Sequence, residues 1–345
     1  TLAENVGSAL NRKELIKILM PPLMLRWNEL NDSDRNMFPL LECLTSVALA
    51  LRTGFLPFAQ AVFSRCLKII HRTLLELQKQ AQAAGGSRQA GYSEEKEFIV
   101  CSLDLLSGLT EGLGSAIESL VGNSNCLMLL YECAKDSDPD VRQSAFALLG
   151  DLAKSCIGHL KPHLDKFVPL ASANIDPAHV SVCNNASWAL GEMALNAGQG
   201  IAEFVPQVMQ RLISLLKYPE APRNLLENVA ITIGRLGLVC PDVIAPGLQH
   251  FCVPWCEHLV GILDPKEREH AYRGLCSVIH KNPRGIVNGI SQLIVAIACY
   301  QNPSENMARM FHQILVGLKN LTGEGWIEAR CDKQAYQVLV ARYGI

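Results

Sequence analysis

The stretch Asp138–Leu152, which reads DPDVRQSAFALLGDL, decides the fold class of this 345-residue chain. After the Asp-Pro pair, apolar side chains between Ala145 and Leu152 recur at helical spacing and fall on one face. Similar segments recur as CNNASWALGEM from Cys183 and as ENVAITIGRL from Glu227, and we call this recurring helical segment the phrase. Convincing alternating patterns of strands are absent. We therefore expect a chain built from one repeated helical unit.

The phrase returns at nearly constant spacing. The aligned residues Gly150, Gly191 and Gly234 lie 41 and 43 residues apart, and further copies lie 43 residues before and after them, at Ser107 and Ser277. A period of about 40–47 residues is typical of two-helix HEAT repeats, which bury their apolar faces only when stacked. The sequence predicts an all-α fold, a right-handed HEAT-repeat α-solenoid in which antiparallel helix pairs form a superhelical arch.

We expect residues 1–345 to form a single array of such repeats. An earlier copy of the phrase starts at Leu40, and the surplus length before the next copy is assigned to a flexible Gly/Ser/Gln-rich insert at residues 81–93. The helices that pair with the phrase are predicted at Leu160–Ala173, Ile201–Lys217 and Val243–Leu263. Recurring small residues inside the phrase predict a close approach of this paired helix.

Composition narrows the classes of function. The chain is 49% hydrophobic, has a net charge of −2 and a pI near 6.5, which argues against a protein that binds nucleic acid by neutralising phosphates. No apolar run reaches the length that we expect of a membrane span. The 13 cysteines are mostly scattered singly among apolar residues, as free thiols in a reducing compartment are. Because Thr1 starts within an amphipathic pattern and no initiator Met is present, we expect a piece of a longer chain.

Aligned rows of the repeats predict which side chains line the concave face. The expected surface is acidic and rich in amides, and Trp188 is the large aromatic residue in its middle. Alternatively, Trp188 packs into a neighbouring repeat and the acids form an ordinary solvated face. The three rows are Val100, Gln143, Asn184 and Glu227; Asp104, Ala147, Trp188 and Ile231; and Gly108, Asp151, Glu192 and Arg235, with Glu111 one turn beyond Gly108.

No pattern of an enzyme or a metal site is found. The sequence lacks a phosphate-binding loop, a Gly-x-Ser-x-Gly elbow and a His-Glu-x-x-His motif. The best metal candidates are His250, Cys252, Cys256 and His258, but the two histidines would lie two helical turns apart, so the four cannot close on one zinc ion. We expect no catalysis and no cofactor.

Several motifs resemble the C-terminal half of the transportins, also called karyopherins β2, within the importin-β superfamily. The resemblance is collinear and covers nearly all of the chain, and it is weakest at the insert and after Gly323. It implies that the chain is the C-terminal arch of a longer receptor. The motifs are Phe38–Leu44, Leu103–Leu109, Val141–Ser144, Ser181–Ala186, Leu225–Asn228, Ile231–Gly237 and Pro254–Cys256, and Arg342–Ile345 resembles the end of the family's chains.

The resemblance implies a nuclear import receptor that shuttles between cytoplasm and nucleus. The concave face of such receptors binds extended, basic proline-tyrosine nuclear localisation signals, many of them on RNA-binding proteins. RanGTP releases the cargo by binding an N-terminal arch, and the receptors also bind nucleoporins; neither nucleic acid nor a membrane is bound directly. That arch, the family's other tryptophan and the proline-tyrosine subsite would precede Thr1. The rival reading is a HEAT-repeat scaffold for protein assembly without an import role.

Carried over position by position, the resemblance assigns twelve cargo-binding residues. Trp188 matches the tryptophan that holds the N-terminal part of the signal. Apolar positions around it are Phe38, Val100, Val180 and Ile231; acidic positions are Glu42, Asp104 and Glu111; and Gln143, Asp151, Asn184 and Glu192 are assigned by row and resemblance together. An extended basic peptide needs amides for its backbone, acids for its cations and an aromatic anchor, so the residue types fit.

Overall fold

The structure, a computed structural model, describes residues 2–83, 94–323 and 333–344. Within these ranges every regular element is helical, as the sequence predicts. The chain divides into two compact units, residues 1–171 and 172–345, and each is described here by itself. That the repeats form a single array over the whole chain stays a prediction.

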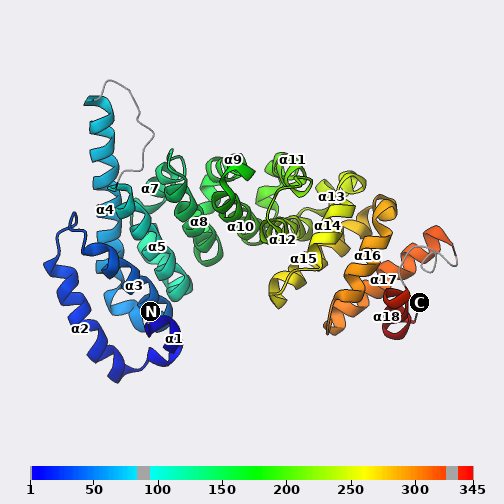
Figure 1. The fold of residues 1–345 in the computed structure, drawn as a ribbon, viewed down its shortest axis with the longest axis horizontal. Coiled ribbons are helices and arrows are strands. Elements are labelled where there is room, and N and C mark those ends of the chain that lie inside the picture. Colours follow the sequence, from blue (N-terminus) through cyan, green and yellow to red (C-terminus); the bar gives the residue numbers. More distant parts are fainter. Residues whose placement is uncertain (1, 84–93, 324–332, 345) are drawn as a thin grey trace. The chain divides into compact units, whose positions relative to one another are not determined.

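Unit 1 is built from two layers of helices (Figure 1). The helices α3, α5 and α8 pack side by side in one layer, and α4 and α7 cover it from the other side. Following the convention for HEAT repeats, we call the first layer B helices and the second A helices. The helices are α1 (Leu2–Val6), α2 (Lys13–Glu29), α3 (Met37–Leu51), α4 (Leu56–Ala83), α5 (Lys96–Leu113), α6 (Glu118–Gly122), α7 (Cys126–Cys133) and α8 (Pro139–Leu160).

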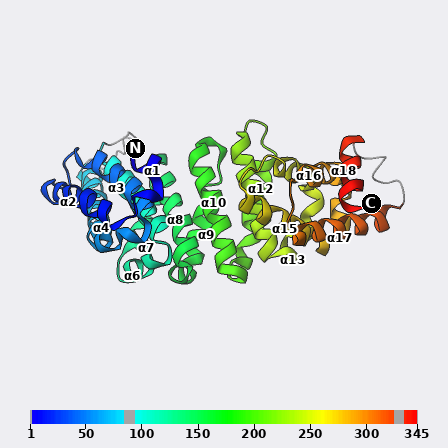
Figure 2. The same ribbon diagram turned by 90° about the horizontal axis from the view of Figure 1, so that it is seen from below.

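Unit 2 repeats this arrangement, with α10, α12 and α15 as consecutive B helices (Figure 2). The helix α9 (Leu164–Ala173) spans the boundary of the units. The remaining helices are α10 (Val180–Ala197), α11 (Val205–Leu216), α12 (Arg223–Val239), α13 (Pro241–Ile244), α14 (Cys252–Leu259), α15 (Pro265–Lys281), α16 (Ile290–Cys299), α17 (Glu305–Thr322) and α18 (Lys333–Tyr343).

Aspartate-proline pairs set where several B helices begin. The carboxylate of Asp138 accepts a hydrogen bond from the backbone N–H of Asp140 at 3.0 Å, and that of Asp264 accepts two from the start of α15 at 2.8 and 2.9 Å. Asp176 caps the 3-10 turn that leads into α10. These bonds satisfy N–H groups that the first helical turn leaves free, and the following proline needs no such bond. The Asp-Pro signals in the sequence are therefore real helix starts.

Small residues bring neighbouring B helices together, not a B helix and its paired A helix as expected. A Cβ atom added at Gly112 of α5 would lie 2.5 Å from the backbone oxygen of Ala48 on α3. One added at Gly234 of α12 would meet the backbone of Ala271 on α15. The prediction of a close approach is confirmed, but its partner was wrong, because the stacking of successive repeats presses their B helices together.

Three further expectations need correction. The predicted insert begins too early, since residues 81–83 still belong to α4, while residues 84–93 lie outside the described residues. The predicted helix at Leu160–Ala173 starts later, at Leu164, because α8 runs to Leu160. The predicted helix at Val243–Leu263 is broken into α13, a 3-10 segment and α14.

Two helical stretches are long and apolar enough by composition to pass for membrane spans, contrary to our expectation. They are Met37–Ala83 and Lys96–Gly122, and 50% and 61% of their most apolar windows are buried inside the structure. Their buried side chains form the contact between A and B helices of unit 1, as in any stacked solenoid.

The twelve cysteines of the described residues all have free thiols, and ten of them are buried.

Candidate functional site

Helix α10 presents the residues around Trp188. Trp188 is half-buried, whereas the other tryptophans of the described ranges, Trp27 and Trp255, are 2% and 0% exposed. Val180 is 38% exposed at the start of the helix, and Asn184 is half-buried one turn before the indole. The structure thus leaves the indole of Trp188 partly accessible. We call Val180, Asn184 and Trp188 the Trp188 surface.

Polar contacts fix α10 against α12 directly beside this surface. The side-chain amide of Asn228 donates to the backbone oxygen and to Oδ1 of Asn184, at 2.8 and 3.0 Å. One turn on, the hydroxyl of Thr232 donates to the backbone oxygen of Ser187 at 2.9 Å. Oδ1 of Asn184 already accepts one hydrogen bond from Asn228, and the side-chain N–H₂ group of Asn184 is a donor suited to an incoming backbone carbonyl.

The third predicted row is not a solvent-exposed surface. Gly108, Asp151, Glu192 and Arg235 are all buried, the last three at 7%, 7% and 3% exposure. Ile231, from the second row, is also buried at 5%. The expectation that these side chains face solvent was wrong, because they lie in the seams where successive B helices touch.

The charges in these seams are paired within the protein. The hydroxyl of Ser107 on α5 donates to the carboxylate of Asp151 on α8. In unit 2, Nη2 of Arg235 lies 2.9 Å from Oε1 of Glu192 and 3.4 Å from Oε1 of Glu267 on α15. Asp151 and Glu192 therefore hold B helices together in this structure.

Unit 1 carries the predicted acids on α3 and α5. Glu42, Asp104 and Glu111 are exposed, as expected. The pKa of the Asp104 carboxyl is raised, because the surrounding protein removes part of its water and because Glu97 and Glu42 place like charges nearby, while a hydrogen bond from the hydroxyl of Ser144 opposes the rise. Burial is the main cause of the raised pKa of Asp104, and the charges of Glu97 and Glu42 add to it.

Glu97 is an acid that the sequence analysis missed. It lies on α5 seven residues before Asp104, which itself lies seven residues before Glu111. Positions seven apart share one face of a helix, so this spacing was a readable signal. We call Glu42, Glu97, Asp104 and Glu111 the acidic surface.

The remaining predicted residues of unit 1 lie around these acids. Phe38 is half-buried, and its ring packs on that of Phe98 with 4.4 Å between the centroids. Val100 and Gln143 are half-buried. Phe38 and Val100 thus give the acidic surface a partly accessible apolar margin.

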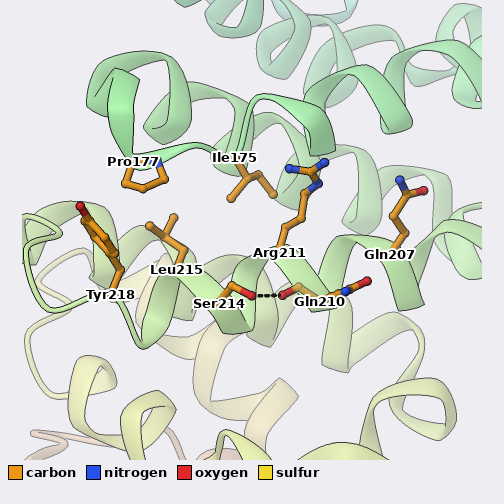
Figure 3. Close-up of a pocket in the computed structure, with 8 residues that line it drawn as sticks. All are labelled: Ile175, Pro177, Gln207, Gln210, Arg211, Ser214, Leu215 and Tyr218. Atoms are coloured by element: carbon orange, nitrogen blue, oxygen red, sulfur yellow. Dashed lines mark hydrogen bonds between the residues drawn. The ribbon is translucent and has the colours of Figure 1, made fainter.

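A separate pocket lies between α11 and the segment that precedes α10 (Figure 3). None of the predicted site residues lines it. Its walls mix apolar and polar groups, and the hydroxyl of Ser214 donates within it to the backbone oxygen of Gln210 at 2.9 Å. The lining residues are Ile175, Pro177, Gln207, Gln210, Arg211, Ser214, Leu215 and Tyr218.

The described part of the chain holds no group of three or more His, Cys, Asp or Glu side chains arranged for a metal ion. Among the former candidates, Cys252 and Cys256 are buried, and burial raises the pKa of both thiols. Burial also lowers the pKa of His258. A raised thiol pKa disfavours the thiolate that binds metal.

Comparison with known proteins matches both the fold and the sequence. The HEAT repeat family matches residues 129–156, which lie within the pair α7–α8. The chain is 47% identical to Transportin-1 of Homo sapiens over 329 residues, 45% identical to Transportin-1 of Oryza sativa subsp. japonica over 350, and 38% identical to Importin subunit beta-2 of Schizosaccharomyces pombe over 349. These matches cover 94%, 100% and 100% of the chain, but 36%, 38% and 38% of the relatives.

Solved structures share the fold at low sequence identity. A chain from the structure of Kap95p with RanGDP matches 95% of this chain and 42% of its own length, with a TM-score of 0.65 and 14% identity. A chain from the structure of Kap121p bound to RanGTP matches 98% and 37%, with a TM-score of 0.56 and 12% identity. Likeness at this identity concerns the solenoid fold alone.

Proposed function

The chain belongs to the transportin family of importin-β-type proteins, and on that premise we propose that it is the cargo-binding part of a nuclear import receptor. The chain spans little more than a third of the length of the relatives it matches. The proposed ligand is an extended basic nuclear localisation signal of the proline-tyrosine type, carried by cargo such as RNA-binding proteins. The proposal involves no enzymatic step.

The observation that carries the proposal is the partial exposure of Trp188 on a B helix. An indole exposed beside an amide is a favourable anchor for an apolar side chain of an extended peptide, since burying it removes a large area from water. The hydrogen bonds from Asn228 and Thr232 hold α10 in place, so little ordering is needed when a peptide binds.

The acidic surface of unit 1 supports the same ligand class. The charges of Glu42 and Glu97 add to the effect of burial in raising the pKa of Asp104, so a cationic side chain that binds there relieves repulsion. Arginine and lysine pair well with such carboxylates. We propose that Glu42, Glu97, Asp104 and Glu111 bind basic residues of the signal, with Phe38 and Val100 as apolar contacts beside them.

The buried members of the predicted site are proposed as supports. Ile231, Asp151 and Glu192 are buried, and we propose that they shape the surfaces instead of forming first contacts with the ligand. Gln143 is half-buried and is proposed as a backbone contact.

We further propose that the complete receptor shuttles between cytoplasm and nucleus and uses RanGTP and nucleoporins as partners. Solved structures of the fold show Kap121p with RanGTP and with Nup53p. Release of cargo by RanGTP is part of this proposal and involves regions beyond the present chain.

Truncation of Trp188 tests the proposal. Trp188→Ala is expected to weaken an arginine-rich proline-tyrosine signal peptide by about 2 kcal/mol, because it removes a central aromatic anchor, and to leave the melting temperature nearly unchanged. Isothermal titration calorimetry measures the affinity. Tyr218→Ala is the matched control: Tyr218 is 39% exposed and lies just beyond the end of α11 in the same unit, and its truncation should not change the affinity. Equal affinities of wild type and Trp188→Ala would remove the indole from the site.

Salt separates the proposal from the rival scaffold role. Raising the salt concentration from about 50 to about 300 mM should weaken binding of the basic peptide, because ions screen its attraction to exposed carboxylates. An affinity that does not depend on salt would favour the scaffold.

A further inference from the structure

The guanidinium group of Arg235 joins three consecutive B helices of unit 2 through one nitrogen atom. Nη2 contacts Glu192 on α10 and Glu267 on α15, while Arg235 itself belongs to α12. Nε and Nη1 are buried and make no hydrogen bond within the described structure. A guanidinium group has five N–H donors, and here only those on Nη2 pair with the two carboxylates. The pairing is incomplete although the group is 3% exposed.

The two carboxylates are held differently. The side chain of Glu192 is 9% exposed and lies 2.9 Å from Nη2, whereas that of Glu267 is 32% exposed and lies 3.4 Å away. A partly solvated ion pair with one long contact contributes little, and its carboxylate is free to exchange partners. If Glu267 moves away, Glu192 still neutralises the buried guanidinium, so Arg235 is not left as an unpaired buried charge.

We propose that Glu267 is a further cation-binding residue for the ligand of the Trp188 surface. This inference rests on the proposed function and deepens it. The carboxylate of Glu267 leaves Arg235 and pairs with an arginine or lysine side chain of the bound peptide, while Glu192 remains on Arg235. Arg235 holds Glu267 in place in the free protein.

The packing of the B helices fixes where that cation belongs. The contacts of Asn184 with Asn228 and of Ser187 with Thr232 place Trp188 level with the middle of α12. There Gly234 meets Ala271 of α15, so Glu267 lies about one helical turn from the level of the indole.

Two helix spacings therefore separate the axis of α15, which carries Glu267, from the axis of α10, which carries the indole. Neighbouring packed helices lie about 8–10 Å apart, so two steps amount to about 18 Å. An extended chain covers this distance in about five or six residues, at about 3.3 Å each. The cation that Glu267 binds should accordingly stand about five or six positions from the residue that contacts Trp188.

A double-mutant cycle with designed peptides tests the inference. One peptide carries an apolar anchor and an arginine about six positions away; the second has citrulline, which is uncharged and of nearly the same shape, in place of that arginine. Glu267→Gln should weaken the arginine peptide about fivefold and leave the citrulline peptide unchanged, as expected for the loss of one exposed ion pair. Calorimetry measures both affinities.

Glu269→Gln is the matched control. Glu269 lies on the same helix, its side chain is 39% exposed, and it sits 4.0 Å from Arg273. Its substitution should change neither affinity, since it does not contact Arg235 in this structure.

Three outcomes would overturn the inference. An equal loss for both peptides would mean that Glu267 only positions the helices. An unchanged affinity for the arginine peptide, with Trp188→Ala still weakening it, would remove Glu267 while leaving the proposed function intact. If neither Glu267→Gln nor Trp188→Ala changed the affinity for the arginine peptide, the proposed function would be refuted as well.

Discussion

The hydroxyl of Ser107 donates a hydrogen bond to the buried carboxylate of Asp151 and so links α5 to α8 within unit 1. Asp104, three residues before Ser107, accepts from Ser144 of the same neighbour and remains exposed. Two acids on adjacent B helices thus have different environments. One is a structural acid in a seam, and the other belongs to the acidic surface.

This difference predicts opposite phenotypes for the two acids. Asp151→Ala should lower the free energy of unfolding of unit 1 by about 1–3 kcal/mol, because it leaves the hydrogen bond of Ser107 unmade in a buried site. Asp104→Asn should leave stability nearly unchanged but weaken a basic peptide. Urea denaturation and calorimetry measure the two effects, and a stable Asp151→Ala variant with weakened binding would reverse the assignment.

Glycine is required where B helices touch. A Cβ atom at Gly274 would overlap the backbone oxygen of Gly234, and backbone cannot move aside as a side chain can. Gly274→Ala is therefore expected to destabilise unit 2 by about 2–3 kcal/mol through overpacking. Gly317→Ala on α17 is the control, since a Cβ there meets nothing within 4 Å, and it should be neutral or stabilising by up to about 1 kcal/mol. Thermal melts compare the two; similar losses would mean that helix propensity, not contact, sets the cost.

Asp32 should make the stability of unit 1 depend on pH. Its carboxylate lies 2.7 Å from Nε of Arg65 and 3.2 Å from Nζ of Lys68. Burial alone would raise the pKa of Asp32, but the hydrogen bonds and charges of these two residues outweigh it, and the net pKa is lowered. A lowered folded pKa gives stability that is fully present above the unfolded value of about 3.9 and is lost as the pH falls through the folded value.

Asp32→Asn is accordingly expected to cost about 2–3 kcal/mol at pH 7, with the difference from wild type shrinking below about pH 4. Urea denaturation of wild type and Asp32→Asn, at about pH 7 and below about pH 4, measures this difference in the free energy of unfolding. Glu29→Gln serves as the control, because Glu29 forms an exposed pair with Arg26 at 3.5 Å. A cost that stays constant with pH would show that the charge of Asp32 is not what stabilises unit 1.

Asp104 should make the affinity for a basic peptide depend on pH. Because its pKa is raised in the free protein, part of the carboxyl becomes protonated on mild acidification, and a cationic ligand must displace that proton. Affinity should therefore rise with pH through the raised pKa and then level off. Asp104→Asn should remove this part of the pH dependence, whereas Glu111→Gln should weaken binding and keep it. Calorimetry between about pH 4.5 and about pH 7 gives the profile, and an unaltered profile in Asp104→Asn would exclude its carboxyl as the source.

The exposure of the acids Glu42, Asp104 and Glu111 could be read from the sequence, whereas for Trp188 periodicity left packing into a neighbouring repeat open and the family resemblance favoured exposure. Each of these acids occupies a position whose helical periodicity sets it apart from the apolar stripe of its helix. Glu97 was within reach of the same reasoning, at seven-residue spacing from Asp104, but it stands outside the aligned phrase and was overlooked.

The burial of Asp151, Glu192 and Arg235 could not be read in this way. Periodicity distinguishes an apolar from a polar face within one helix, whereas a B helix in a stack also touches the B helices on either side. A polar side chain at such a seam is buried if a partner from the next repeat reaches it. Arg235 does so for Glu192, across 43 residues of sequence.

The sequence by itself determined the all-α fold, the helix starts at Asp-Pro pairs and the recurrence of small residues, because these depend on local periodicity and on backbone chemistry within a few residues. Only the tertiary structure decided which helix each glycine approaches and which acids are neutralised in seams. Those outcomes depend on distances between side chains about 40 residues apart, and such distances are set by how successive repeats pack.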